Sequence, residues 1–227
     1  MKNNAKNSTI LLLLLIVTLT IANCGKEEDF SSFDGSVKGQ VVDISGTPLY
    51  GDINSNTLVV KFLGKGDRQA IEVRVNGEGK FQNLKMFPKA YTVWLEGPVI
   101  KTDTLKIDLS STNNQTADFK LTPLLSPKIS SGTASGTTIN VNYNVTLNAG
   151  NTAKKMEIYC STVMYPTSAI GSLTNVYSTK TVALTALSGS VAITGLSAGT
   201  KYFIRIGAQA GVSTLMNYSN QIQVTTP

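Results

Sequence analysis

The segment ITGLSAGTKYFIRIGAQA, residues 193–210, gives the clearest indication of the fold of the second half of this chain. In its last ten residues Tyr202, Ile204 and Ile206 alternate with other side chains and fall on one face of an extended strand. Such period-two alternation of aromatic and β-branched residues is typical of a half-buried β-strand. The glycines and serine before Lys201 mark a turn that bounds the strand. The segment therefore predicts sheet rather than helix.

Short runs of the same kind fill the surrounding region, and helical periodicity is nearly absent. They are TTINVNYNVTL (137–147), KKMEIYCST (154–162), TKTVALTAL (179–187), SVAITGL (190–196) and NQIQVTT (220–226). Each is rich in Val, Ile, Thr or Tyr, and Gly, Asn, Ser or Pro separates it from the next, which is typical of an all-β domain. We expect one sandwich over 127–227.

The spacing of residues in 193–210 adds a family resemblance. The matching positions are Leu196, Gly199, Thr200, Tyr202, Arg205 and Ala208. This Leu–x–x–Gly–Thr–x–Tyr–x–x–Arg–x–x–Ala pattern resembles the fibronectin type III domain. The resemblance implies that Tyr202 is the tyrosine corner, a structural residue whose hydroxyl bonds to backbone a few residues upstream. The chain departs from the family in lacking its core tryptophan, and we expect Tyr143 or Tyr159 to fill that space.

The first half of the chain has the same strand character over 33–123. QAIEVRV (69–75) places Ile71, Val73 and Val75 on one face, and KAYTVWLEG (89–97) does the same with Tyr91, Val93 and Leu95. We expect these two faces to meet in a sandwich. NGEGKF (76–81) predicts a hairpin turn, because glycine tolerates the positive φ that such turns need.

GQVVDISGTPLYG (39–51), followed by NGEGKFQNLKMFPKAYTVWLEGP (76–98), resembles the transthyretin-like or carboxypeptidase-regulatory-like β-sandwich. Between the two halves, TPLLSPKIS (122–130) carries Pro123 and Pro127. Proline has no N–H for sheet pairing, so we interpret this stretch as a hinge. The sequence thus predicts an all-β protein of two β-sandwich domains in tandem, 33–123 and 127–227.

Residues 1–23 are typical of a secretory signal. Lys2 and Lys6 precede an apolar run of about a dozen residues, shorter than the ~20 that span a bilayer. The run ends in IANC, which resembles the bacterial lipoprotein signal, with Asn23 where Gly, Ala or Ser is usual. The resemblance implies that Cys24 is lipidated, with palmitate among its acyl chains, and anchors the mature chain. The alternative is a freely secreted protein in which Cys24 is incidental.

Residues 24–32 form a polar tether. Lys26, Glu27, Glu28 and Asp29 resemble the surface-export signal of Bacteroidota lipoproteins, in which a lysine and acids follow the lipidated cysteine. This implies an outer-membrane protein exposed at the cell surface. The simpler interpretation is a solvated, flexible tether, because such a composition cannot bury a core, and both interpretations can hold at once.

Composition excludes several chemistries. The chain has no histidine and, apart from Cys24, one cysteine, Cys160, so it lacks Ser–His or Cys–His nucleophiles and zinc sites built from these ligands. The formal net charge is +6, of which the leader lysines contribute two, and no basic cluster with interleaved aromatics indicates nucleic acid. The acids are scattered, so no pair suited to glycoside hydrolysis can be named. We expect no enzyme, cofactor or metal.

The order of the two modules, closed by MNYSNQIQV (216–224), resembles a family of Bacteroidota surface lipoproteins of unassigned activity. Its members are encoded beside the transporter and glycan-binding lipoprotein pairs of polysaccharide utilisation systems. The resemblance covers nearly the whole mature chain. It implies partnership with the outer membrane, a polysaccharide and such a transporter complex.

Sugar rings stack on exposed aromatic side chains, so exposed aromatics are the candidate contacts for glycan or a protein partner. If Tyr91, Val93 and Leu95 point inward, Trp94 points outward, although it can instead pack on a neighbouring segment. The other candidates are Tyr165, Tyr177 and Tyr218, for which ordinary loop packing is the alternative. Thr104, in Asp103–Thr104–Leu105, matches a short O-glycosylation pattern of exported Bacteroidota proteins.

These observations predict a non-catalytic surface lipoprotein that is accessory to glycan capture and import. A structural or adhesive, fimbria-related lipoprotein is the alternative, and it would need an exchangeable strand. The C-terminal QIQVTTP (221–227) is the one candidate for such a strand, and we expect its own sandwich to use it. An enzyme would require two carboxylates facing each other in a cleft.

Overall fold

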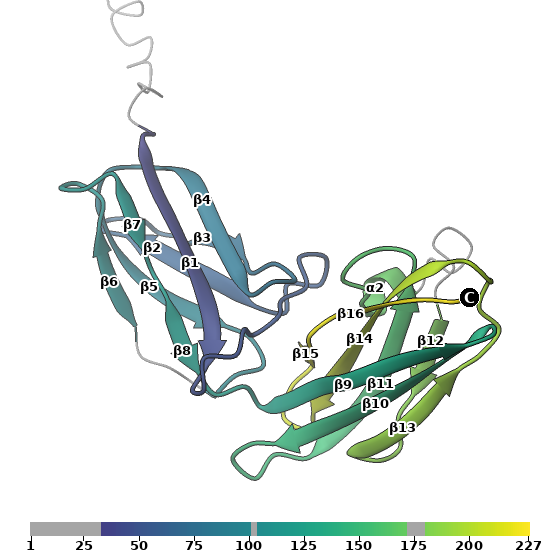
Figure 1. The fold of residues 1–227 in the computed structure, drawn as a ribbon. Helices are drawn as coiled ribbons and strands as arrows, with labels where there is room; N and C mark the ends of the chain where they lie inside the picture. The colour runs from purple at the N-terminus through teal and green to yellow at the C-terminus, as the bar shows by residue number, and fades with distance from the viewer. Residues whose placement is uncertain (1–32, 101–103, 172–179) are drawn as a thin grey trace, which may run out of the picture. The chain divides into compact units, whose positions relative to one another are not determined.

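The computed structural model describes residues 33–100, 104–171 and 180–227, except for the side chains of residues 170 and 171. Residues 34–227 form one compact unit built almost entirely of β-strands (Figure 1). The predicted all-β fold of two tandem sandwiches is confirmed. The predicted leader (1–23) and tether (24–32) lie outside the described residues.

In the part of the chain that the structure describes, the first sandwich contains eight strands in two sheets. They are β1 (Gly35–Asp43), β2 (Val59–Gly64), β3 (Ile71–Arg74), β4 (Lys80–Met86), β5 (Ala90–Glu96), β6 (Leu105–Asp108), β7 (Asn114–Thr116) and β8 (Phe119–Leu121). One sheet has the order β4-β1-β7, with β8 also pairing β1, and the other has the order β3-β2-β5-β6. β1 is antiparallel to β4 and parallel to β7 and β8.

The alternation seen in the sequence produces the core of this sandwich. Tyr91, Val93 and Leu95 are 2%, 0% and 7% exposed, and Val73 and Val75 face the same interior, as predicted. In this core the aromatic rings pack edge to face or tilted: Phe62 lies 6.4 Å between ring centroids from Tyr91 of the same sheet and 6.3 Å from Phe81 of the other. Such apolar burial supplies most of the stability of the domain.

The NGEGKF segment is a turn, but the predicted hairpin is wrong. Asn76 and Lys80 close the turn through a backbone hydrogen bond of 2.8 Å, and Gly79 has the expected positive φ of 80°. However, β3 pairs with β2 in one sheet, whereas β4 pairs with β1 in the other. The turn therefore crosses from sheet to sheet, because each flanking strand finds its partner elsewhere in the chain.

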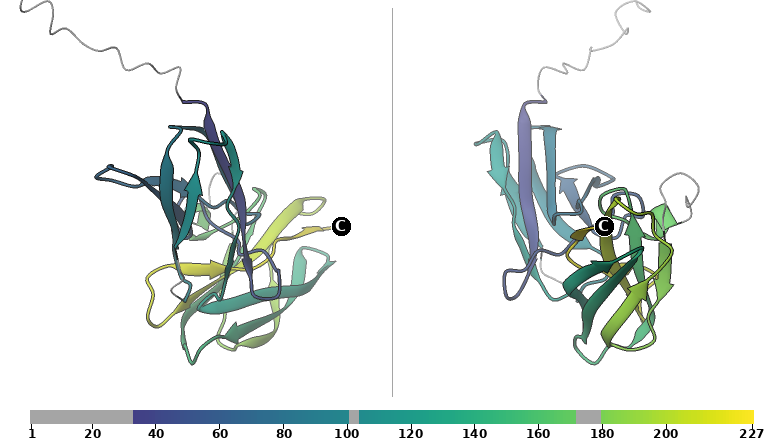
Figure 2. Two further views of the ribbon diagram at one scale, coloured as in Figure 1. Left: turned by 90° about the vertical axis from the view of Figure 1, so that its left-hand side faces the viewer. Right: turned by 45° about the vertical axis from the view of Figure 1, so that its right-hand side comes forward.

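Among the described residues, the second sandwich contains eight further strands and one helical turn. They are β9 (Leu125–Ser135), β10 (Thr138–Leu147), β11 (Ala153–Ser161), α2 (Ser168–Gly171), β12 (Lys180–Ala183), β13 (Ser188–Ile193), β14 (Lys201–Ala210), β15 (Met216–Tyr218) and β16 (Ile222–Thr225). One sheet has the order β13-β10-β9, and the other β12-β11-β14-β15 with β16 also pairing β14. The turned views in Figure 2 help to separate the two layers.

The tyrosine corner forms as the sequence predicted. The Tyr202 side chain is 1% exposed, and its hydroxyl oxygen accepts a hydrogen bond from the backbone N–H of Ser197 at 3.0 Å. Tyr143 lies in the same core, and its hydroxyl donates to the carbonyl oxygen of Ala186 at 3.1 Å. Tyr159 instead packs in a separate cluster near the first sandwich. Of the two residues proposed to replace the missing tryptophan, Tyr143 is therefore the one in the main core.

The proline-containing segment between the sandwiches is not a free hinge. Pro127 lies inside β9, which begins at Leu125, and proline is tolerated there because β9 is an edge strand. Pro123 makes an isolated bridge to Val99 of the first sandwich. The backbone N–H of Leu124 donates to the Pro98 carbonyl oxygen at 2.9 Å. These bonds fix the segment against the first sandwich.

The C-terminal strand β16 pairs with β14 from Ile222 to Thr225. The chain therefore uses in its own sheet the strand that the fimbrial alternative would exchange. Across residues 33–100, 104–171 and 180–227, no helix is long and apolar enough to cross a membrane.

Candidate binding site between the two sandwiches

Asn217, in β15, joins the two sandwiches through its side-chain amide. Its Oδ1 accepts from the backbone N–H of Leu125 at 3.0 Å, and its Nδ2 donates to the Pro98 carbonyl oxygen at 2.9 Å. The side chain is 7% exposed, so both bonds are shielded from water. Buried hydrogen bonds of this kind are costly to break, because the freed groups cannot turn to solvent.

Arg205 makes a second link and is completely buried. Its Nε donates to the Ser219 carbonyl oxygen at 3.3 Å, while Nη1 and Nη2 lie 3.4 Å from the carbonyl oxygen of Gly51 in the first sandwich. Among the described ion pairs none involves Arg205. Its charge is thus held by peptide carbonyls and by aromatic rings.

Three tyrosine rings surround this guanidinium. The guanidinium carbon lies 4.6 Å from the ring centre of Tyr218 and 5.9 Å from those of Tyr50 and Tyr165. Burial lowers the pKa of Arg205 to about 10, against the opposing effects of Tyr218 and Asp52. The group is therefore protonated at neutral pH, and the ring faces offer it cation–π stabilisation in place of water.

Tyr165 continues the contact at the turn of residues 76–80. Its hydroxyl donates to Glu78 Oε1 at 3.1 Å, and its backbone N–H donates to Gln221 Oε1. The ring lies directly over Gly77, where an added Cβ would come within 2.4 Å of it. Only glycine admits so close a ring. The sequence predicts Tyr165 as a candidate contact for glycan or a protein partner. In the structure its side chain instead contacts Glu78 and Arg205 of the same chain.

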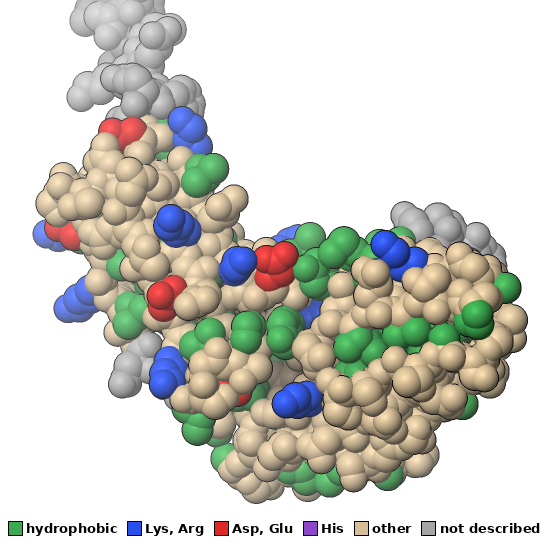
Figure 3. Space-filling view, viewed as in Figure 1, with side chains coloured by type: hydrophobic (Ala, Val, Ile, Leu, Met, Phe, Trp, Pro, Cys, Tyr) green, Lys and Arg blue, Asp and Glu red, His purple; other side chains and the backbone are tan. Residues whose placement is uncertain are grey.

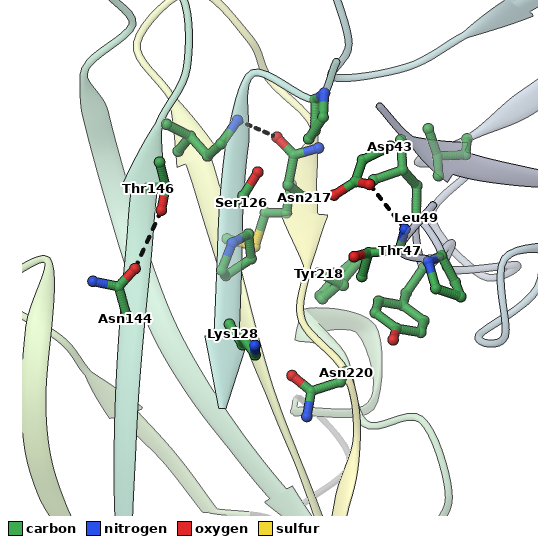
Figure 4. Close-up of a pocket in the computed structure, with 17 residues that line it drawn as sticks. Asp43, Thr47, Leu49, Ser126, Lys128, Asn144, Thr146, Asn217, Tyr218 and Asn220 are labelled. Atoms are coloured by element: carbon green, nitrogen blue, oxygen red, sulfur yellow. Dashed lines mark hydrogen bonds between the residues drawn. The ribbon is translucent and has the colours of Figure 1, made fainter. Parts of the chain in front are cut away.

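A cavity of about 370 Å³ lies beside these links (Figure 4). Its first wall is the loop from Asp43 to Tyr50. Oδ1 of Asp43 accepts from the backbone N–H groups of Ser45 and Thr47, each at 2.8 Å, and Gly46 has the positive φ of 91° that this tight loop requires. Burial raises the pKa of Asp43, but these hydrogen bonds outweigh it, so the net pKa is lowered.

The opposite wall comes from the solvent-facing residues of β9 and β10. Figure 4 shows Ser126 and Lys128 from β9 facing the cavity beside Asn144 and Thr146 from β10. The Thr146 hydroxyl donates to Asn144 Oδ1 at 3.2 Å. Within the described part of the chain neither the Asn144 amide nitrogen nor the Lys128 ammonium has a hydrogen-bond partner. These donors are available to a ligand.

The cavity is lined by one carboxylate, one ammonium group, uncharged polar side chains and tyrosine rings, among others. Of the described residues that line it, Asp43 is the one carboxylate, whereas glycoside cleavage uses two. No group of three potential metal-ligating side chains occurs anywhere in the described residues. What the cavity provides is amide, hydroxyl and ammonium groups beside Tyr50 and Tyr218. That combination is suited to a polyhydroxylated ligand, whose hydroxyls need hydrogen bonds and whose C–H faces need apolar contact.

Trp94 is not part of this cavity. It is half-buried on the outward face of β5, as the alternation predicted, and its Nε1 donates to Glu96 Oε1 at 2.9 Å. Its cross-strand neighbour Lys61 pairs with Glu72 and, at 3.5 Å, with Glu96. The indole therefore lies in a surface network of hydrogen bonds and ion pairs on the first sandwich.

The remaining predicted positions are distributed as follows. Tyr218 lines the cavity, but it is only 5% exposed because its ring packs on Arg205, so it does not form a surface platform. Thr104 is exposed and immediately precedes β6. Several positions lie outside the described residues: Cys24, Lys26, Glu27, Glu28, Asp29 and Tyr177.

Sequence reasoning missed most of the cavity. It treated Arg205 only as a position in a family pattern and did not single out Lys128, Asn144 or Thr146. One signal was present: Asn140, Asn142 and Asn144 recur at alternate positions, although asparagine is depleted in strands. That this strand lines a cavity together with the loop of the first sandwich has no signal in the local pattern.

No protein-family model matches the chain, and no curated protein matches it. Solved structures do. A DUF3823 family protein from Bacteroides ovatus has a TM-score of 0.69 at 17% identity, covering 86% of this chain and 100% of that one. A DUF3823 family protein from Parabacteroides merdae has a TM-score of 0.66 at 15% identity, covering 84% and 98%.

A third solved structure, from Bacteroides uniformis, bears the name "putative carbohydrate binding protein". Its TM-score is 0.64 at 18% identity, with 85% of this chain and 99% of that chain covered. At such identities the likeness concerns the fold. Over nearly its whole described length, then, this chain shares the two-sandwich fold of DUF3823 family proteins from Bacteroides and Parabacteroides.

Proposed function

We propose that this chain is a non-catalytic, lipid-anchored lipoprotein of the outer-membrane surface that binds glycan in the cavity between its sandwiches. The observation that carries the proposal is the chemistry of that cavity. It offers uncharged amide and hydroxyl groups beside tyrosine rings, and the Lys128 ammonium, which has no hydrogen-bond partner among the described residues. The name of the similar Bacteroides uniformis protein supports the same ligand class.

The two links at Asn217 and Arg205 support this reading physically. They tie the first sandwich to the second on the side where the cavity lies. A preformed site loses less conformational entropy when a ligand binds, so weak individual contacts to sugar hydroxyls suffice. The proposed role is capture: the protein holds glycan at the surface as an accessory to an import complex.

Affinity electrophoresis tests the binding. The protein is run through gels that contain neutral or anionic polysaccharides, beside a Lys128→Ala/Asn144→Ala double variant. We expect a neutral polysaccharide to retard the wild type and the double variant to lose that retardation. Lys201→Ala, which removes an exposed lysine from the opposite sheet, is the matched control, and Trp94→Ala tests the outer face of the first sandwich. Retardation that Trp94→Ala abolishes and the double variant retains would move the site to Trp94.

The anchor has its own test. Cells that express the full chain are labelled with radioactive palmitate, beside cells that express Cys24→Ala. We expect label in the wild type and none in the variant. Label in both would refute lipidation at Cys24, and protection of the tether from external protease would refute surface exposure.

A further inference from the structure

The outward face of the sheet β13-β10-β9 carries an ordered set of polar side chains. Along β10 every second residue is exposed, and these are Asn140, Asn142, Asn144 and Thr146. The residues between them are buried in the core. Figure 3 shows a mostly uncharged surface over β9 and β10, with a band of hydrophobic side chains running across the same sandwich.

The strand register extends this row into a grid. Asn140 pairs with Thr133, Asn142 with Ser131 and Ser190, Asn144 with Lys128 and Ser188, and Thr146 with Ser126. Neighbouring positions lie roughly 6.8 Å apart along a strand and ~4.8 Å apart between strands. We call these residues the polar grid. Lys128 is the one charged side chain among them.

The composition of the polar grid is unusual for a solvent-facing sheet surface in two respects, strand propensity and charge. Asparagine is a poor strand former, yet it occupies three outward positions of the central strand. Solvent faces of sheets also tend to carry charges of both signs, which keep proteins soluble and discourage edge-to-edge association. The opposite sheet of the same sandwich follows that rule, with Lys155, Glu157 and Lys201 on its outer face. Departures from local rules concentrate at functional sites.

The grid is continuous with the cavity. Ser126, Lys128, Asn144 and Thr146 belong to both. From Asn144, the grid extends along β10 by about 14 Å to Asn140. Asn142 is held in place, because its Nδ2 donates to Ser131 Oγ at 2.9 Å and the Ser130 hydroxyl donates to its backbone carbonyl oxygen at 3.1 Å. Asn142 is exposed, and among the described residues its Oδ1 accepts no hydrogen bond, so it is available to a ligand as an acceptor.

On the basis of the function proposed above, we infer that the ligand is an extended, uncharged glycan chain. One end occupies the cavity, and the chain then runs along β10 over Asn142 and Asn140. Amides and hydroxyls both donate and accept, as sugar hydroxyls do, so a regular array of them matches a repeating polyol. A grid with a single cation does not match a uronic-acid or sulfated chain, whose many charges would require several lysines or arginines.

Calorimetry on the full-length chain, in a detergent without a sugar headgroup, tests this. The probes are the disaccharide and the hexasaccharide of whichever neutral polysaccharide retards the wild type. The variant is Asn140→Ala/Asn142→Ala, and Gln223→Ala removes a matched exposed amide from β16. We expect the double variant to bind the hexasaccharide about tenfold more weakly, as loss of one or two hydrogen bonds implies, and the disaccharide unchanged. Gln223→Ala should match the wild type. If the alanine pair fails to fold, Asn140→Asp/Asn142→Asp keeps the shape and should weaken hexasaccharide binding at least as much.

The outcomes separate this inference from the function on which it rests. Equal hexasaccharide affinity for the wild type and both Asn140/Asn142 variants overturns the inference, while the proposed function stands if Lys128→Ala/Asn144→Ala still abolishes binding. Tighter binding of polygalacturonate or chondroitin sulfate than of any neutral chain also overturns it. Absence of glycan binding by the wild type overturns both. Concentration-dependent dimers that the Asn140/Asn142 variants abolish would identify the grid as a contact between copies instead.

Discussion

Replacing Arg205 measures how strongly the two sandwiches are joined. Arg205→Ala removes the donors to the Gly51 and Ser219 carbonyl oxygens and the cation beside Tyr218, and it leaves a cavity in a fully buried site. The hydrogen bonds are long, at 3.3–3.4 Å, so we take the lower end of the ~1.5–3 kcal/mol for each charged donor. The aromatic contact adds about 2 kcal/mol where it is desolvated.

One effect of Arg205→Ala is stabilising, because the variant no longer has to bury a charged group. Desolvating an ion costs several kcal/mol in real proteins, and that cost disappears with the guanidinium. The cavity left by alanine adds a penalty, so we expect a net loss of about 3 kcal/mol in the free energy of unfolding. Arg205→Met fills part of the same volume and can contact the tyrosine rings through its sulfur, so its expected loss is smaller, about 1 kcal/mol.

Urea unfolding followed by two probes is the assay. Trp94, the one tryptophan of the chain, reports on the first sandwich through fluorescence, and far-ultraviolet circular dichroism reports on both. We expect the two transitions to coincide in the wild type and to separate in Arg205→Ala, because the variant uncouples the sandwiches. A loss below ~0.5 kcal/mol with coincident transitions would refute the reasoning. An Arg205→Met variant more stable than the wild type would show that the buried charge costs more than its contacts return.

Three further predictions concern single side chains. Tyr202→Phe should lower the free energy of unfolding by about 1 kcal/mol, because the Ser197 N–H loses its acceptor, and a near-neutral effect in thermal or urea unfolding would argue against the tyrosine corner. Asp43→Asn should destabilise the protein at neutral pH but not in acid. The pKa of Asp43 is lower in the folded state than in the unfolded chain, so its contribution is present above the unfolded pKa and is lost as pH falls through the folded one. A wild-type-minus-variant stability difference that persists at pH 2 would contradict this. Cys160 should resist thiol reagents at pH 8 in a Cys24→Ser chain until urea unfolds it, because it is 0% exposed and burial raises its pKa to about 12. Rapid labelling of the native form would disprove this.

The strands and the two cores could be predicted from the residue pattern alone. Period-two alternation over residues 89–97 and 201–206 depends only on which face of a strand each side chain occupies, so local reading suffices. The same holds for Tyr202, whose partner lies five residues away. The absence of histidine also excluded Ser–His and Cys–His nucleophiles without any structure, because it is a property of composition alone.

How these elements assemble could be seen only in the tertiary structure. The turn at 76–80 connects the two sheets of the first sandwich, and Arg205 is buried among tyrosines from both sandwiches. The loop at Asp43 lies across the cavity from Lys128. The residues in such contacts are up to 154 positions apart in the chain, as Gly51 and Arg205 are. Contacts of that separation depend on how whole sheets pack, and no local period encodes them. The strands could therefore be predicted from the local sequence pattern. The cavity could not, because it forms only where the two folded sandwiches meet.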